Sequence, residues 1–163
     1  MIDDRRPEIE VVEFTERWAA DFARLNYEWI EKYFAVERHD REILENPKEF
    51  VIEPGGQIFI ALVHGRAAGT VAMIPADDRV VELTKMAVSP AFQGLGVGNR
   101  LMEKRIEFAK ANAFATIFLE THSSLVPAIA LYHKHGFAEV PCDPNSLYAR
   151  ADVRMELDLI HNS

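Results

Sequence analysis

The chain has 163 residues, 48% of them hydrophobic and 27% charged, which predicts a single globular domain over residues 1–163. Its formal net charge of −8 argues against a general nucleic-acid-binding protein, because an excess of carboxylates repels phosphates. No apolar run approaches the roughly 20 residues that span a bilayer, and the chain does not begin with the apolar core of a signal peptide, so we expect no membrane partner. The single cysteine, Cys142, fits a cytoplasmic location.

The first part of the chain predicts a strand followed by an amphipathic helix. Residues 9–14 are rich in β-branched side chains, and Thr15 is expected to cap the helix after them. We expect one helical stripe to pack in the core, with the alternative that its C-terminal end, near Phe34, borders a binding pocket. The stripe consists of large apolar residues at helical spacing: Trp18, Phe22, Leu25, Trp29 and Tyr33.

A short, charged helix is expected over residues 37–45. It ends before Asn46-Pro47, because the residue that precedes a proline avoids helical geometry. We expect its charged side chains to form a solvated face: Glu37, Arg38, Asp40, Arg41 and Glu42.

Three strands in an antiparallel meander are expected next. After a turn at residues 53–56, the apolar runs 58–63 and 67–74 flank a hairpin turn at Gly65-Arg66, and residues 80–88 form the third strand. A doubly wound sheet would need helices between these strands. Lys85 interrupts the alternation of the third strand, which indicates either a side chain that reaches solvent or a β-bulge.

Glycines alternate at Gly94, Gly96 and Gly98, between that strand and a helix expected to start at Asn99. Glycine permits φ > 0 and close approach to the backbone, so successive N–H groups can converge on an anion at the positive end of the helix dipole. We expect a phosphate or pyrophosphate there. One alternative is a dinucleotide fold with Glu120 as its acidic residue, but too little sequence follows the loop for the remaining βαβ units.

The C-terminal part predicts a parallel βαβ unit and a last helix. The strand at 115–120 should lie parallel to 80–88, after a helix whose inner face carries Met102, Ile106, Ala109 and Ala113.

Ser123 or Ser124 is expected to cap the last helix, which has Pro127 in its first turn and ends at Gly136. Two further strands are expected, at residues 137–140 and 153–159.

Two motifs resemble the signatures of the GNAT N-acetyltransferases. Gln93-x-x-Gly96-x-Gly98, preceded by the strand end at residues 86–90, is similar to the segment of that family that binds the pyrophosphate of acyl-CoA. Further along, Leu131-Tyr132-x-Lys134-x-Gly136-Phe137 matches the second signature. The resemblance covers residues 80–140. It implies an α/β fold with a mixed (α+β) sheet of about seven strands, flanked by helices on both faces, in which a splayed parallel pair binds acyl-CoA.

The resemblance also implies acetyl-CoA as the acyl donor. Backbone N–H groups before the helix would hold the pyrophosphate, and pantetheine would pair with the strand end as an added strand. The start of the last helix would flank the pantetheine arm, although Leu125 stands where many family members have Asn. The implied cofactor-binding residues are Met86, Ala87, Val88, Gln93, Gly94, Leu95, Gly96, Val97, Gly98, Asn99, Ser124, Pro127, Ala128 and Tyr132.

The implied reaction transfers an acetyl group to a primary amine, so it needs a base for the amine and a proton for the thiolate. By the resemblance, Tyr132 matches the tyrosine that gives its proton to the leaving thiolate in that family. Glu82, six residues before Val88, and Glu120, twelve residues before Tyr132, match the catalytic glutamates of two branches. Both stay open as the base, with Glu82 favoured. His122 is a further candidate, and an N–H near Val88 is the expected oxyanion donor.

The sequence does not identify the acceptor amine, which can be a small molecule or a protein, and the chain is expected to be a monomer or a homodimer. The alternative function is a non-catalytic acyl-CoA-binding sensor or regulatory module. Tyr148 and Arg150 could meet an acceptor carboxylate, although we expect them at the surface. No metal is expected, because His133-x-His135 on a helix points its rings apart.

Overall fold

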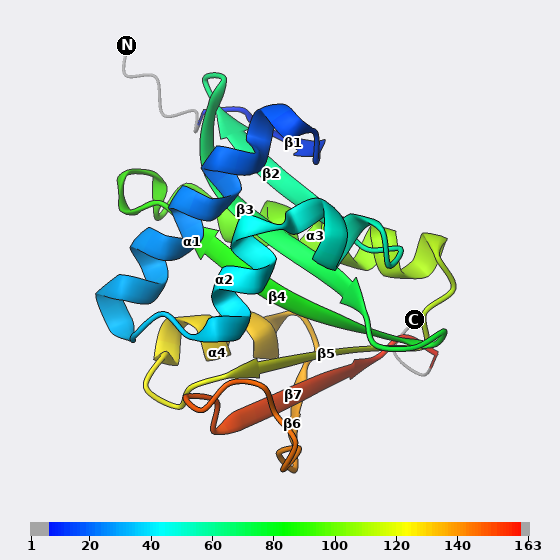
Figure 1. The fold of residues 1–163 in the computed structure, drawn as a ribbon. Helices are drawn as coiled ribbons and strands as arrows, with labels where there is room; N and C mark the ends of the chain where they lie inside the picture. The colour runs from blue at the N-terminus through cyan, green and yellow to red at the C-terminus, as the bar shows by residue number, and fades with distance from the viewer. Residues whose placement is uncertain (1–6, 161–163) are drawn as a thin grey trace.

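The computed structural model describes residues 7–160, which build one seven-stranded sheet in the order β1-β2-β3-β4-β5-β7-β6 (Figure 1). Only β4 and β5 pair in parallel; every other neighbouring pair is antiparallel. The predicted mixed sheet is therefore confirmed, and this topology excludes the dinucleotide fold, which needs a mostly parallel sheet. The strands are β1 (Ile9–Glu13), β2 (Gln57–Val63), β3 (Arg66–Pro75), β4 (Val80–Val88), β5 (Thr116–Thr121), β6 (Ala138–Val140) and β7 (Val153–Asp158).

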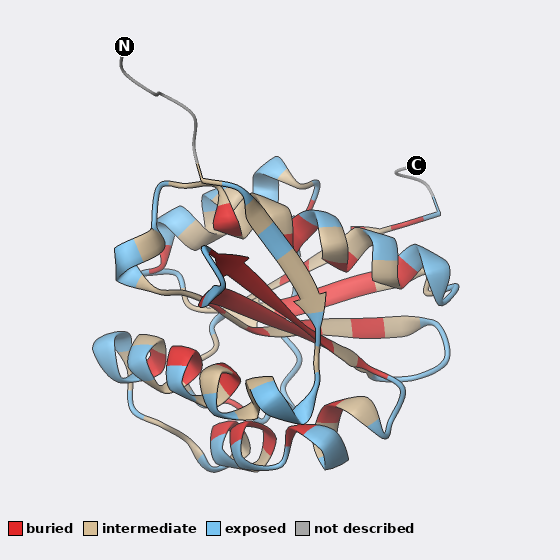
Figure 2. Ribbon diagram, turned by 90° about the horizontal axis from the view of Figure 1, so that it is seen from above, coloured by how far each residue is buried: buried red, intermediate tan, exposed pale blue. Residues whose placement is uncertain are grey.

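Helices cover both faces of the sheet, as the edge-on view in Figure 2 shows. On one face, α1 (Ala19–Tyr33) and α2 (Arg38–Glu45) share a buried cluster with the sheet. On the other face, α3 (Val97–Ala111) and the buried Tyr132 of α4 (Val126–Lys134) share a second cluster. Three short turns of helix connect these elements, at Glu16–Trp18, Lys48–Ile52 and Pro90–Phe92.

A β-bulge at Lys85 reverses the alternation of the central strand β4. Lys85 has φ +52, and the register with β3 jumps from Thr70–Ala87 to Ala72–Thr84. Before the bulge Leu83 faces the α3 side, and after it Met86 packs against that same side while Ala87 faces α1. The expected bulge is confirmed. The Lys85 side chain does not reach solvent, because it points into the protein beneath α2.

The two parallel strands part after a short contact. β4 pairs with β5 only at Val80–Thr116, Val81–Ile117 and Glu82–Phe118. Beyond these pairs the described residues of the two strands form no further bridge, so backbone groups of β4 and β5 face a gap. This is the splayed parallel pair that the sequence resemblance implies.

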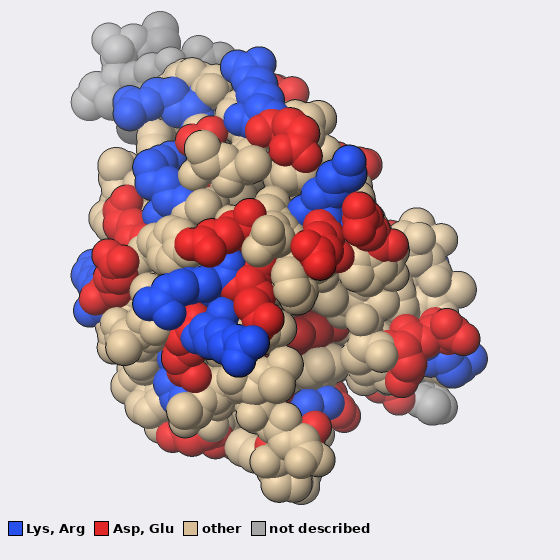
Figure 3. Space-filling view, viewed as in Figure 1, with Lys and Arg blue, Asp and Glu red and all other residues tan. Residues whose placement is uncertain are grey.

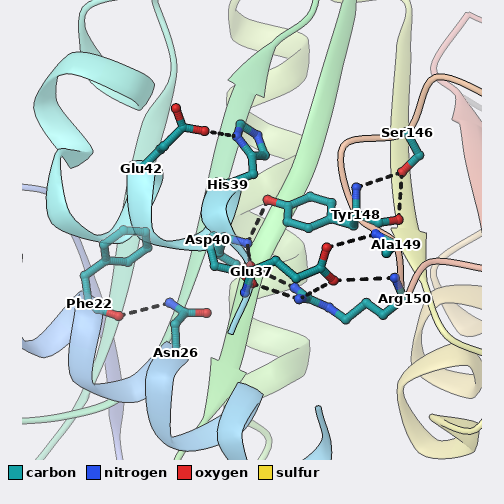
Figure 4. A network of polar contacts seen from close by, with 11 residues as sticks. Phe22, Asn26, Glu37, His39, Asp40, Glu42, Ser146, Tyr148, Ala149 and Arg150 are labelled. Carbon is teal, nitrogen blue, oxygen red and sulfur yellow. Dashed lines mark hydrogen bonds and ion pairs between the residues drawn. The ribbon is translucent and has the colours of Figure 1, made fainter. Parts of the chain in front are cut away.

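A buried ion cluster fastens α2 to β4 and to the loop before β7 (Figure 4). Asp40, which has no exposed surface, accepts a hydrogen bond from Lys85 Nζ at 2.6 Å and two from the Arg150 guanidinium at 2.8 Å each. Arg150 also donates to Glu37 at 3.1 Å, and Lys85 donates to the Tyr148 hydroxyl at 2.8 Å. The pKa of Asp40 lies below its ordinary value: burial alone would raise it, but the hydrogen bonds from Arg150 and the charge of Lys85 outweigh burial.

This cluster corrects two expectations. Asp40 and Glu37 do not belong to a solvated helix face, and Tyr148 and Arg150 do not lie free at the surface. The charged residues of the short helix have partners far along the chain, which no local pattern can reveal: Lys85 lies 45 residues from Asp40 and Arg150 lies 110.

Three local expectations are also wrong. Thr15 precedes a short 3₁₀ turn and makes no side-chain cap, because α1 begins only at Ala19. α4 begins after Leu125, and no serine hydroxyl caps it. Ala113 lies beyond the end of α3 with φ +59 and is exposed, whereas Arg105 occupies the inner face of that helix.

Among residues 7–160, no helix combines the length and the apolar character needed to cross a membrane. The surface over α1 and α2 carries basic and acidic side chains in alternating patches (Figure 3).

We predict that Asp40→Ala lowers the free energy of unfolding by about 3–5 kcal/mol, because it leaves Lys85 and Arg150 buried without their shared carboxylate. Glu42→Ala is the matched control on the same helix. Within residues 7–160 the Glu42 side chain pairs with His39 alone, near the surface, so its loss should cost less than about 1 kcal/mol. Denaturant unfolding of both variants measures the difference. Equal losses would show that the cluster does not hold α2 in place.

Candidate functional site

Two neighbouring hollows lie where β4 and β5 part. The inner pocket is enclosed by α1, the two strands and the loop before β7, and it contains Trp29, Phe34, Glu82, Lys85, Glu120, His122, Tyr132, Tyr148 and Arg150. The loop groove runs along the glycine-rich loop between α3 and α4, and it contains Met86, Val88, Gln93, Gly94, Gly96, Gly98, Asn99, Pro127 and Tyr132. Trp29, Met86 and Tyr132 line both hollows and therefore stand at their junction.

The loop groove has the backbone geometry of an anion site. Gly94 and Gly96 adopt φ +81 and φ +89, and Gly96 is the N-cap of α3 without any side-chain cap. The first N–H groups of a helix have no partner within it, so those of Val97, Gly98 and Asn99 point out of the helix end. The helix dipole adds positive potential at this place. A Cβ at Gly98 would lie 3.3 Å from Leu131 Cδ2, so the glycine also keeps this end of the groove open.

The structure brings together most of the residues expected to bind a cofactor. Gln93, Gly94, Gly96, Val97, Gly98 and Asn99 lie along the groove with Met86, Ala87, Val88, Pro127, Ala128 and Tyr132. Two residues stand apart. Leu95 packs against the hydrophobic core beneath the loop, and Ser124 is exposed, with its hydroxyl 2.7 Å from His122 Nδ1.

Tyr132 is held at the junction by packing. The residue is 8% exposed, and its ring meets that of Phe137 edge to face, with centroids 6.1 Å apart. Burial raises the pKa of Tyr132 to about 12, so the phenol carries its proton throughout the physiological range. A proton donor is thus present where the groove meets the inner pocket.

Two carboxylates face the inner pocket in different surroundings. Burial, followed by the charge of Glu120, raises the pKa of Glu82 to about 7. Glu120 accepts a hydrogen bond from the Ser146 hydroxyl and lies 3.9 Å from Arg154. No hydrogen bond or ion pair holds the Glu82 carboxylate among residues 7–160, so it is the group better able to exchange a proton near neutral pH.

His122 lies in the wall of the inner pocket, and its ring meets that of Phe34 edge to face, with centroids 5.4 Å apart. Its Nε2 atom is 3.7 Å from Asp152 and its Nδ1 atom contacts Ser124. The ring is therefore engaged at both nitrogens by groups outside the pocket.

Sequence reasoning missed Arg105, a fully buried residue of α3. Its guanidinium stacks over Phe137 at 4.7 Å, and its two terminal nitrogens have no hydrogen-bond partner among residues 7–160. Burial lowers the pKa of Arg105 to about 9, while the neighbouring Tyr132 acts in the opposite direction. The four-residue spacing of Leu101, Arg105 and Ala109 was the signal that placed it on the inner face.

In the part of the chain that the structure describes, no three His, Cys, Asp or Glu side chains lie close enough together to hold a metal ion. The inner pocket and the loop groove together present a buried carboxylate, a phenol and backbone N–H groups that can face an anion.

Comparison with known proteins agrees with this geometry. Residues 12–137 match the model of the acetyltransferase (GNAT) family. An uncharacterized N-acetyltransferase of Schizosaccharomyces pombe is 30% identical over 144 residues, which are 82% of this chain and 87% of the relative. The N-acetylaspartate synthetase of Xenopus tropicalis is 34% identical over 92 residues, 56% of this chain. The chain spans about a third of the length of that relative, 34%.

Solved structures share the fold. An acetyltransferase of the GNAT family from Staphylococcus aureus superimposes with a TM-score of 0.85 at 23% identity, over 93% of this chain and 99% of the other. An acetyltransferase of Salmonella typhimurium, solved with its cofactor acetyl-CoA, has a TM-score of 0.72 at 20% identity, over 93% and 94% of the two chains. The match of the family model and the relative that aligns along most of both chains show that this chain belongs to the GNAT acetyltransferase family, as its two motifs predict.

Proposed function

We propose that the protein is an N-acetyltransferase that transfers an acetyl group from acetyl-CoA to a primary amine by direct attack on the thioester. The observation that carries the proposal is the position of Tyr132, whose protonated phenol stands where an anion-binding groove meets a pocket with a titratable carboxylate. On this proposal, residues 1–163 act as one acetyltransferase domain. A cytoplasmic location remains a prediction from the sequence.

The loop groove suits coenzyme A. The N–H groups of Val97, Gly98 and Asn99 would hold the pyrophosphate at the start of α3. The edge of β4 that faces the gap, at Met86 to Val88, offers backbone groups to the amides of pantetheine. The bound acetyl-CoA of the Salmonella protein, whose fold this chain shares, supports the same donor here.

The residues at the junction can complete the reaction with balanced protons. Glu82 accepts a proton from the ammonium form of the acceptor, and the neutral amine attacks the thioester carbonyl carbon. A backbone N–H near Val88 stabilises the oxyanion. As the C–S bond breaks, Tyr132 donates its proton to the thiolate, and its phenolate recovers a proton from the new C–N nitrogen. The products are the acetylated amine and free CoA thiol, and Glu82 returns its proton to water.

Glu82 suits the role of base better than Glu120. A general base is most effective when its pKa lies near the working pH, and that of Glu82 is about 7. Glu120 is engaged by Ser146 and lies near Arg154, and its negative charge acts on Glu82. We therefore propose that Glu120 acts indirectly, because its charge raises the pKa of Glu82.

We predict that Tyr132→Phe lowers kcat on the order of 10²-fold with little change in CoA affinity, because the variant keeps the ring but loses the proton. Release of CoA thiol in the presence of amines measures the rate, and calorimetry measures the affinity. Tyr27→Phe is the matched control, since Tyr27 contacts Glu45 away from both hollows. An unchanged kcat in Tyr132→Phe would remove Tyr132 as the proton donor. Tight CoA binding without turnover of any amine would instead favour a sensor.

We predict that kcat/KM rises with pH through a midpoint near 7, because Glu82 must be ionised to accept a proton. Glu82→Gln should remove this limb of the profile. Glu120→Gln should keep the limb and move its midpoint to lower pH, because removal of a like charge favours ionisation of Glu82. If Glu120→Gln abolished the rise of kcat/KM with pH and Glu82→Gln kept it, Glu120 would be the base and Glu82 the neighbour that shifts its pKa.

We predict that Gly94→Ala weakens CoA binding about tenfold, because a Cβ at φ +81 adds strain of about 1–2 kcal/mol and moves the loop out of its binding conformation. Gly65→Ala provides the control. Gly65 has φ +75 in the β2–β3 hairpin, and neither glycine has an atom within 4 Å of its would-be Cβ. Both variants should lose similar stability, but only Gly94→Ala should lose affinity in calorimetric titration with CoA. Equal CoA affinity in the two variants would count against the loop as the pyrophosphate site.

A further inference from the structure

We propose that the acceptor is a small primary amine with an apolar or aromatic body and no carboxylate. This inference rests on the proposed function, because it concerns the acceptor of that same reaction. The inner pocket is the place for the acceptor, since it joins the loop groove at Tyr132 and Met86 and contains the carboxylate of Glu82. The pocket is partly open to solvent, so a small molecule can enter it.

The cations of the inner pocket are already paired with carboxylates of the protein. Lys85 has a side chain only 3% exposed and lies 2.6 Å from Asp40. Arg150 forms a bidentate pair with the same carboxylate and a further bond with Glu37. Figure 4 shows the Arg150 side chain directed at Glu37 and Asp40. An incoming carboxylate would have to displace Asp40, which has no exposed surface.

His122 offers no better partner to a carboxylate. When protonated it faces Asp152, whose oxygen lies 3.7 Å from Nε2. Each basic group in the wall of the pocket thus has an acidic partner outside the pocket, so none is left to balance an anionic substrate.

The carboxylates of the pocket favour a cation instead. Glu120 lies 3.9 Å from Arg154, which also lies 3.5 Å from Glu156, so its charge is only partly balanced. Glu82 has no basic side chain within ion-pair distance among residues 7–160. An ammonium group would supply the missing positive charge, whereas a carboxylate beside these two groups would add like-charge repulsion in a place of low dielectric.

The remaining walls are apolar. Trp29, Ile30, Phe34, Leu119 and Leu125 line the pocket together with the ring of Tyr148. Such a surface binds an alkyl or aryl body by burial of apolar area, and aromatic faces also attract a cation. Rejection of carboxylates and attraction of an apolar cation together define the acceptor class.

The test compares acceptors that differ only at the carboxylate. Phenethylamine and phenylalanine share the same aromatic body, and phenylalaninamide replaces the carboxylate of phenylalanine with a neutral group. We expect kcat/KM for phenethylamine to exceed that for phenylalanine by about 10²-fold or more, and phenylalaninamide to recover at least a tenth of the phenethylamine value. CoA thiol release at pH 8 gives these rates.

A variant tests the cause of this preference. Glu37→Gln removes one partner of Arg150 and leaves its guanidinium more available, so the ratio of phenethylamine to phenylalanine should fall about tenfold. Glu42→Gln is the control on the same helix, because Glu42 pairs with His39 outside the pocket, and the ratio should stay unchanged. The melting temperatures of both variants show whether each is folded.

The outcomes separate this inference from the proposed function. Phenylalanine, aspartate or a peptide N-terminus acetylated as well as phenethylamine would overturn the acceptor class and leave the acetyltransferase intact. CoA binding without acetylation of any amine would overturn both. A folded Glu37→Gln variant with an unchanged ratio would overturn the pairing of Arg150 as the cause of selectivity, and the wild-type panel decides the acceptor class by itself.

Discussion

The buried carboxylate of Asp40 is the interaction on which the rest of the site depends. It accepts hydrogen bonds from Lys85 on the central strand and from Arg150 in the loop before β7, so one residue of α2 joins three segments that are remote in sequence. Breaking such a pair leaves charges in a place of low dielectric, whereas forming it costs desolvation. The main effect of the cluster is therefore to fix the position of α2 and of the loop before β7 relative to the gap between β4 and β5.

The β-bulge at Lys85 works together with this cluster. A regular strand would send alternate side chains to the same face throughout, but the extra residue reverses the alternation halfway along β4. Glu82 and Lys85 can then both face the inner pocket, while Met86 lies at its junction with the loop groove. The parting of β4 and β5 after Glu82 leaves the space into which these groups point.

The electrostatics of the pocket follow from this arrangement. Two carboxylates share one pocket, and burial together with the charge of Glu120 raises the pKa of Glu82, while Glu120 itself lies 3.9 Å from Arg154. The cations nearby are already committed to Asp40 and Glu37, so they stabilise the fold and shape the pocket without serving as a docking point for an anion. On the proposed acceptor class, specificity arises from ion pairs within the protein as well as from the carboxylate of Glu82, which is unpaired within residues 7–160.

The sequence by itself determined the elements whose cause is local. Alternation and turn residues predicted the strands, and Gly94 and Gly96 predicted a loop with φ > 0. The strand–helix–strand order predicted the parallel pair, and the two motifs predicted the family. The tertiary structure alone decided the partners of charged residues. From the sequence alone Asp40 was predicted to lie on a solvated helix face, because its partners Lys85 and Arg150 are 45 and 110 residues away. The pKa of a carboxylate likewise depends on burial and on neighbouring charges that only folding brings together.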